Sequence, residues 1–170
     1  MNWPVVILAF VTFQRLGELV LARRNTARLL AAGAYEVGAP HYPIIVMFHA
    51  VWLVGLWWLA PGQNVNWVLI GIFVALQALR IWVISTLGAR WTTRIICVPN
   101  ETLIARGPFR FLKHPNYAVV ALEAFVLPLA FGLVAYALVS GIINICILAW
   151  RISVENAALA GTLRRSLIQF

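Results

Sequence analysis

Residues 115–151, PNYAVVALEAFVLPLAFGLVAYALVSGIINICILAWR, decide the fold, because they determine whether the chain crosses a membrane four or five times. About 20 apolar residues are enough to cross the hydrocarbon core of a bilayer, and this stretch is nearly twice as long. Pro128 and Gly132 interrupt it near its middle, where helices tend to end. We therefore predict a tight helical hairpin near Gly132, with one span at 115–133 and a second at 134–151.

The rest of the chain is equally apolar. Of its 170 residues, 63% are hydrophobic and only 11% are charged, and the mean hydropathy is +0.90. Soluble domains contain about 45–50% apolar and about 25% charged residues. Further apolar spans lie at 3–22, 43–60 and 66–87. These features predict a single all-α domain over residues 1–170, folded as a polytopic membrane helix bundle of about five transmembrane helices.

Basic residues are confined to alternate connections between these spans, and the loops after the second and fourth spans carry none. Lys and Arg of short loops face the cytoplasm, so five crossings place the N-terminus outside and the C-terminus in the cytoplasm. Four or six crossings would divide the basic residues between the two sides. We predict the tail at 156–170 to be an amphipathic helix lying at the interface. The basic residues after the first, third and fifth spans are Arg23, Arg24 and Arg28; Arg90, Arg94, Arg106, Arg110 and Lys113; and Arg151, Arg164 and Arg165.

The net charge of +8 does not indicate a nucleic-acid-binding protein, because the basic residues alternate with apolar spans instead of covering one soluble face. Cys97 and Cys146 lie far apart and lack the spacing of metal ligands, so we predict no metal site. The first residues lack the basic start of a secretory signal, and Arg15 interrupts the apolar run that follows. We interpret this segment as a retained helix.

Ionisable residues occur inside three of the spans, where they are costly and are functional candidates by default. Arg15 and Glu18 are three residues apart and can pair on one helix face. Arg80 lies near the cytoplasmic end of its span and can extend toward the interface. Glu123 has no basic residue within a turn, so we expect it to be protonated or to contact a bound ligand.

The segment ETLIARGPFRFLKHPNY, residues 101–117, is the most informative part of the chain. Gly-Pro at 107–108 and His-Pro at 114–115 break the backbone, and irregular backbone near a membrane usually lines a cavity. His114 and Tyr117 share one side of the first turn of the fourth span. Alternatively, His-Pro only starts a helix.

Arg151 and Glu155 lie four residues apart on one helix face at the end of the fifth span. The simplest reading is an ordinary ion pair at the interface. The predicted hairpin, however, returns them to the membrane side that holds His114. We therefore look for a site where these two segments meet.

The motifs KHPNY, residues 113–117, and RISVE, residues 151–155, together resemble the signature of the isoprenylcysteine carboxyl methyltransferase family, in particular its small bacterial branch. The resemblance extends over residues 88–159. The early segment QRLGE at 14–18 and RWTTRI at 90–95 also resemble that branch.

The resemblance implies a membrane-embedded methyltransferase that uses S-adenosylmethionine without a Rossmann domain, with the cofactor bound at the cytoplasmic ends of the fourth and fifth spans. It implies a substrate-side role for Arg151. The family commonly has a second Glu where this chain has Asn156, and some relatives have Tyr at the position of Phe109. The cofactor contacts implied by the resemblance are Arg94, Glu101, Thr102, Leu103, Ile104, Phe109, His114, Pro115, Asn116, Tyr117 and Glu155.

The resemblance also implies a lipophilic methyl acceptor, which would carry either a carboxylate or a phenol or pyrone hydroxyl. A carboxylate needs no base, whereas a hydroxyl would benefit from one, and Glu123 is the candidate base if it is ionised. The bacterial branch favours the phenol or pyrone. Arg151 and Glu123 are thus the candidate catalytic residues, and we expect the bacterial inner membrane, with the active site facing the cytoplasm.

Two other functions stay open at this point. Sterol-reductase-like proteins share this C-terminal architecture and would bind a nicotinamide cofactor in a similar pocket. A small membrane transporter or assembly factor would use Glu123 and the Arg15/Glu18 pair for ions or helix contacts. The sequence does not indicate the identity of the acceptor or the oligomeric state.

Overall fold

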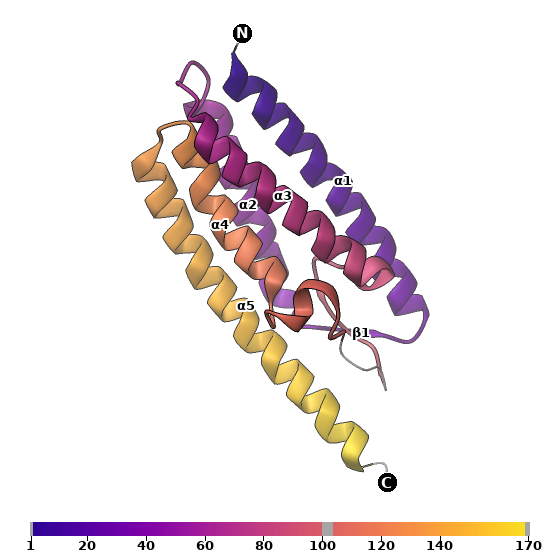
Figure 1. Ribbon diagram of the computed structural model, residues 1–170. Helices are drawn as coiled ribbons and strands as arrows, with labels where there is room; N and C mark the ends of the chain where they lie inside the picture. Colours follow the sequence, from indigo (N-terminus) through magenta and orange to yellow (C-terminus); the bar gives the residue numbers. More distant parts are fainter. Residues whose placement is uncertain (1, 100–103, 169–170) are drawn as a thin grey trace.

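The computed structural model describes residues 2–99 and 104–168, with residue 41 and residues 158–168 described by their backbone alone. Within this part, five long helices form one bundle, and the N- and C-termini lie at its opposite ends, as five antiparallel passes require (Figure 1). The helices are α1 (Trp3–Ala31), α2 (Tyr42–Leu59), α3 (Trp67–Leu87), α4 (Pro115–Ala130) and α5 (Val134–Ile168).

The predicted hairpin between α4 and α5 is confirmed. Pro128 lies inside the last turn of α4, and its carbonyl accepts a hydrogen bond from the Leu133 amide at 3.0 Å. Gly132 has a φ of 72°, a left-handed conformation in which glycine is favoured. The chain therefore reverses over three residues, and α5 runs back beside α4.

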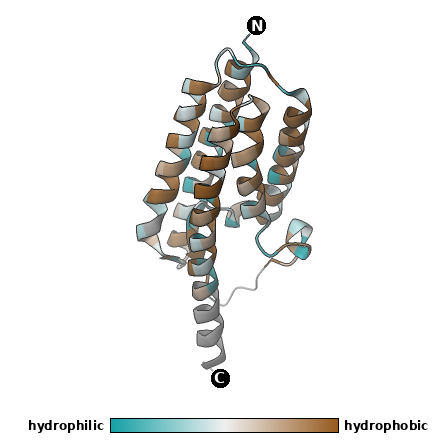
Figure 2. Ribbon diagram, turned by 90° about the vertical axis from the view of Figure 1, so that its left-hand side faces the viewer, coloured by the Kyte–Doolittle hydropathy of each residue, from teal (hydrophilic) through white to brown (hydrophobic). Residues whose placement is uncertain are grey.

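The surface of the bundle is apolar along the helices, and hydrophilic residues gather at the helix ends and loops (Figure 2). Phe13 is 75% exposed and Trp58 is 85% exposed, for example, which suits contact with lipid. Among the described residues, four helices are long and apolar enough to cross a membrane, and α4 is a shorter apolar helix of 16 residues. The predicted all-α polytopic fold is thus supported, while the number of crossings and their orientation stay predictions.

Two helices run further than predicted. Helix α1 continues to Ala31 instead of ending near residue 22, and α5 continues to Ile168. The separate interfacial helix predicted for residues 156–170 is therefore wrong, because its described part is a continuation of α5. The physical reason is that neither extension contains a proline or an early glycine that would end a helix.

A small antiparallel ribbon, which we did not predict, joins β1 (Tyr35–Val37) to β2 (Ile95–Cys97). It ties the loop after α1 to the long segment between α3 and α4. Buried Asn25 on α1 also holds this segment, donating to the carbonyls of Gly88 at 3.1 Å and Trp91 at 2.8 Å. Three single turns complete the fold: η1 (Ala39–His41), η2 (Gly88–Arg90) and η3 (Gly107–Arg110).

The apolar core lies at the end of the bundle that holds the N-terminus. Leu8, Leu56, Phe73 and Leu127, from four different helices, are buried there with Phe131. The opposite end, where α4 begins and α5 continues, is held together by polar contacts. That end carries the candidate site.

Candidate functional site

A cavity of about 580 Å³ opens where the first turn of α4 meets α5, η3 and β2. This volume is in the usual range for small-molecule sites, about 300–1,000 Å³. Three of the predicted cofactor contacts, Glu101, Thr102 and Leu103, lie outside the described residues. The functional roles of the remaining predicted site residues stay predictions. Nine of the predicted site residues line the cavity: Arg94, Ile104, Phe109, His114, Pro115, Asn116, Tyr117, Arg151 and Glu155.

Tyr117 is the centre of this arrangement. Its hydroxyl accepts a hydrogen bond from Nε of Arg151 at 2.8 Å and donates one to the carboxylate of Glu155. Pro115 starts α4 at its first position, which places Tyr117 one turn above His114. The Tyr117 hydroxyl thus links Arg151 to Glu155. An ordinary ion pair between these two residues along α5 would not involve a residue of α4.

Arg151 is 6% exposed, and its position is fixed from two sides. Besides the bond to Tyr117, its Nη2 donates to the Thr93 carbonyl at 2.7 Å. Its Nη1 forms no hydrogen bond within the described part of the chain. A buried guanidinium with one nitrogen still available can bind an anionic group in the cavity.

His114 stacks against Tyr117, with ring centroids 5.4 Å apart and an angle of 21° between the planes. Its Nδ1 lies 3.6 Å from a carboxylate oxygen of Glu155. The prediction that His114 and Tyr117 share one side of the first helical turn is therefore confirmed.

Within the described part of the chain, three buried polar atoms on cavity residues have no hydrogen-bond partner: Nε2 of His114, Oδ1 of Asn116 and Nε1 of Trp91. Other buried polar atoms without a partner occur elsewhere in the described bundle, but these three belong to residues that line the same cavity. Leaving a buried polar atom without a partner costs about 1–3 kcal/mol. A polar ligand that bonded these atoms would recover that cost.

Arg94 is held by residues that sequence reasoning missed. Its Nη1 donates to Glu36 at 2.7 Å, and its guanidinium lies 4.5 Å from the centre of the Tyr42 ring. The hydrogen bond to the Glu36 carboxylate raises the pKa of Arg94 above its ordinary value. These partners follow α1 in the chain, and the β1–β2 pairing together with the hydrogen bond between the Tyr42 and Thr93 hydroxyls brings them to Arg94.

Glu123 does not line the cavity, and its basic partners come from other helices. It is 3% exposed, and it accepts hydrogen bonds from Arg15 at 2.8 Å, Gln77 at 2.7 Å and Arg80 at 3.3 Å. Arg15 and Arg80 reach Glu123 from α1 and α3, so the sequence within one helical turn of Glu123 does not indicate them.

Arg80 is also buried, at 7% exposure, and does not extend toward the interface as predicted. It bonds Glu18 at 2.6 Å, and the predicted Arg15–Glu18 pair is confirmed at 2.9 Å. We call Arg15, Glu18, Arg80 and Glu123 the ion cluster. It contains two charges of each sign, so the burial of these side chains is compensated within the bundle.

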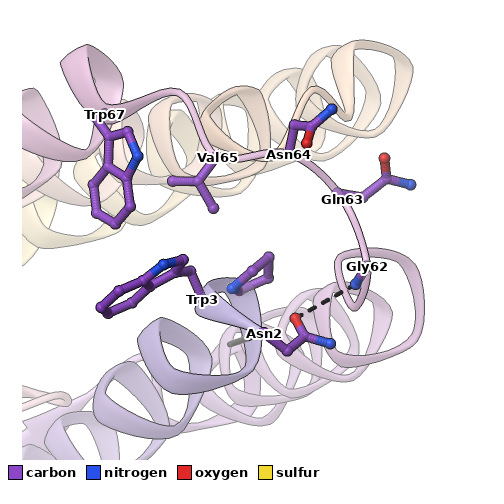
Figure 3. Close-up of a pocket in the computed structure, with 8 residues that line it drawn as sticks. Asn2, Trp3, Gly62, Gln63, Asn64, Val65 and Trp67 are labelled. Atoms are coloured by element: carbon purple, nitrogen blue, oxygen red, sulfur yellow. Dashed lines mark hydrogen bonds between the residues drawn. The ribbon is translucent and has the colours of Figure 1, made fainter.

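A second concavity of about 540 Å³ lies at the opposite end of the bundle, between the N-terminus and the loop from α2 to α3 (Figure 3). Trp3 and Trp67 meet edge to face there, and the Asn2 side chain accepts a hydrogen bond from the Gly62 amide. Its lining residues carry no ionisable side chain, and none of them is a predicted site residue.

Comparison with known proteins agrees with the resemblance seen in the motifs. The chain is 32% identical to the uncharacterized protein YpbQ of Bacillus subtilis (strain 168), over 91% of this chain and 95% of that protein. An uncharacterized protein of Haemophilus influenzae is 24% identical, over 91% of this chain and 94% of its own length. The model of the isoprenylcysteine carboxyl methyltransferase (ICMT) family matches residues 69–161. This chain belongs to the ICMT family.

The matched region of this ICMT family member runs from α3 into the second half of α5 and contains all nine described cavity residues named above. Family membership implies a membrane methyltransferase. No solved structure is a significant match to the chain.

Proposed function

We propose that this ICMT family member is an S-adenosylmethionine-dependent O-methyltransferase that modifies a lipophilic acceptor, with the cofactor bound in the cavity between α4, α5 and η3. One observation carries the proposal: Tyr117 joins Arg151 to Glu155 at the edge of a cavity where three buried polar atoms lack partners among the described residues. The family match supports the reaction class.

The cavity residues fit such a cofactor. When bound, S-adenosylmethionine supplies an activated methyl group on a sulfonium. Glu155 can accept hydrogen bonds from hydroxyl or amino groups, and His114, Asn116 and Trp91 offer unpartnered polar atoms. Phe109 adds an aromatic face, which attracts a cation.

Arg151 is the residue we assign to the acceptor. Its positive charge favours the ionised form of a carboxylate, phenol or pyrone hydroxyl, which is the nucleophilic form. The bonds to Tyr117 and Thr93 hold its guanidinium in one position, so an acceptor bound to Nη1 would be oriented as well as ionised. Apolar residues of the cavity wall, Leu29, Leu87 and Phe111, suit a lipid-like acceptor and exclude water.

This assignment makes a separate base unnecessary for an acidic hydroxyl. Glu123, the base suggested by the sequence, does not line the cavity, and its carboxylate already accepts hydrogen bonds from Arg15 and Arg80. We therefore favour an acceptor whose hydroxyl or carboxyl ionises beside Arg151.

The membrane arrangement belongs to the same proposal. Five crossings, with the N-terminus outside and the cavity on the cytoplasmic side of a bacterial inner membrane, would give the cavity access to a water-soluble cofactor and to a lipid-soluble acceptor. The concentration of cationic residues near the cavity, including Arg110 and Lys113, supports this orientation.

Calorimetric titration of the purified full-length protein in detergent with S-adenosylhomocysteine and, separately, with NADPH tests the proposal. We expect S-adenosylhomocysteine to bind and NADPH not to bind. Binding of NADPH alone would favour a reductase, and binding of neither would favour a transporter or assembly factor.

A further inference from the structure

The segment 106–113, which contains η3 and precedes the start of α4, presents an apolar tip next to cations. Phe111 is 71% exposed and Leu112 is 51% exposed. Arg106, Arg110 and Lys113 flank this tip and are exposed. No acidic residue occurs between 104 and 113. We call residues 106–113 the basic loop.

The length of α4 sets the depth of this loop. At a rise of about 1.5 Å per residue, the 16 residues of α4 span roughly 24 Å, less than the roughly 30 Å hydrocarbon core of a bilayer. If α4 reaches the far side, its first residue begins near the boundary between acyl chains and headgroups. Phe111 and Leu112 lie four and three residues before this residue, so we place their exposed side chains near the same boundary.

The base of the loop is fixed, while its tip is exposed. Gly107 has a φ of 59°, and a Cβ there would lie 2.6 Å from the Thr86 hydroxyl at the end of α3, so only glycine fits against this helix. Pro108 is buried. The Arg110 guanidinium lies 5.2 Å from the centre of the Phe111 ring, so a cation and an aromatic ring are presented together.

The same loop forms part of the cavity wall. Phe109, Arg110, Phe111, Leu112 and Lys113 all line the cavity described above. A ligand that binds the exposed side of the basic loop would therefore also position one wall of the cavity.

We propose that the basic loop binds anionic phospholipid of the leaflet that surrounds it, with phosphates at Arg110 and Lys113 and with Phe111 and Leu112 at the level of the first acyl carbons. The excess of positive charge selects anionic over neutral headgroups. Exposed aromatic and aliphatic side chains beside cations are typical of segments that lie in the interface. Lipid binding by the loop does not require methyl transfer. Only the further step, that bound lipid positions one wall of the cofactor site, rests on the proposed function.

Fluorescence quenching of a probe on the loop tests this proposal. An environment-sensitive fluorophore is attached to Leu112→Cys in a Cys146→Ser background, since the remaining Cys97 is buried. The full chain is reconstituted in phosphatidylcholine nanodiscs with or without phosphatidylglycerol. Quenching is measured with lipids that carry a nitroxide at a shallow acyl carbon, and with aqueous iodide.

We expect the nitroxide lipid to quench the probe strongly and iodide to quench it weakly. Phosphatidylglycerol should increase lipid quenching at least twofold. The double variant Arg110→Gln/Lys113→Gln should lose this increase, whereas Arg110→Lys should keep it. The matched control Arg23→Gln/Arg24→Gln removes two exposed charges from α1, outside the basic loop, and should also keep the increase.

Quenching by iodide alone would overturn the proposal. So would lipid quenching that does not respond to phosphatidylglycerol, or a response that survives in Arg110→Gln/Lys113→Gln. Because the probe reports depth and not activity, these results are independent of whether S-adenosylhomocysteine binds.

Discussion

The hydroxyl of Tyr117 on α4 donates a hydrogen bond to the carboxylate of Glu155 on α5. The same hydroxyl accepts a hydrogen bond from Arg151, one turn earlier on α5. Helix packing and site geometry are therefore linked, because the contact that joins α4 to α5 also orients the two charged residues of the cavity.

Replacing Glu155 by alanine should weaken binding of S-adenosylhomocysteine by more than tenfold. The loss of a charge-assisted hydrogen bond is worth about 1.5–3 kcal/mol. Calorimetry on the purified variant measures the effect. Ser153→Ala, at an exposed position of the same helix, is the matched control and should bind like the unmodified chain. Unchanged affinity of Glu155→Ala for S-adenosylhomocysteine would show that this carboxylate does not bind the cofactor.

Tyr117→Phe should lower affinity for S-adenosylhomocysteine by about five- to tenfold, since removing one hydrogen-bonding group costs on the order of 1 kcal/mol. The ring and its stacking on His114 are retained, so the hydroxyl alone is tested. Tyr136→Phe removes a comparable hydroxyl, which donates to the Trp52 carbonyl outside the cavity. This control should leave binding unchanged. Equal effects of both variants on affinity would argue against a specific role for the Tyr117 bridge.

Much of the candidate site was predictable from the sequence, because its residues occur in two short motifs that a hairpin brings together. Helical periodicity predicts that His114 and Tyr117 share one side of α4. The hairpin predicts that Arg151 lies at the same end of the bundle as His114. Glu36 and Tyr42 were not predictable, because the three-residue strands that bring them to Arg94 are too short to give a periodic signal. Glu123 was misread because its partners are distant in sequence.

Glu123→Gln should destabilise the protein while leaving S-adenosylhomocysteine affinity unchanged. Removing one partner of a buried ion pair costs about 3–5 kcal/mol, since it leaves an uncompensated charge. A thermal unfolding series in detergent should show a lower midpoint for Glu123→Gln. The double variant Glu123→Gln/Arg80→Gln should recover part of the loss.

The same variant tests the suggestion from the sequence that Glu123 is a base. If folded Glu123→Gln bound S-adenosylhomocysteine normally but transferred no methyl group to an acceptor used by the unmodified chain, the base role would hold. Retained transfer would assign Glu123 to the ion cluster alone.

Gly141→Ala should loosen the packing of α5 against α4. A Cβ at residue 141 would collide with the Phe125 ring, closer than real side chains approach. Overpacking of this kind costs about 1–3 kcal/mol. Gly71→Ala on α3 is the matched control, because a Cβ there meets nothing within 4 Å. The thermal midpoint should fall for Gly141→Ala only, and equal midpoints would show that α4 and α5 can separate without cost.

The helices themselves followed from the apolar spans, and Gly132 marked the hairpin. The ends of α1 and α5 could not be predicted from the apolar spans. Hydropathy indicates which residues can lie in lipid, but it does not indicate where a helix ends. Polar residues after Leu21 and Trp150 end the apolar spans, yet the segments that follow contain no proline and include strong helix formers such as Arg, Ala, Leu and Glu, so both helices continue.

Photolabelling locates the cofactor most directly. The full chain is irradiated with S-adenosylmethionine carrying a radioactive methyl group, and the labelled peptides are identified by mass spectrometry. We predict label within residues 104–117 or 151–155, prevented by excess S-adenosylhomocysteine. Label in the concavity at the opposite end, lined by Trp3 and Trp67, or label that S-adenosylhomocysteine does not displace, would contradict a cofactor site at Tyr117.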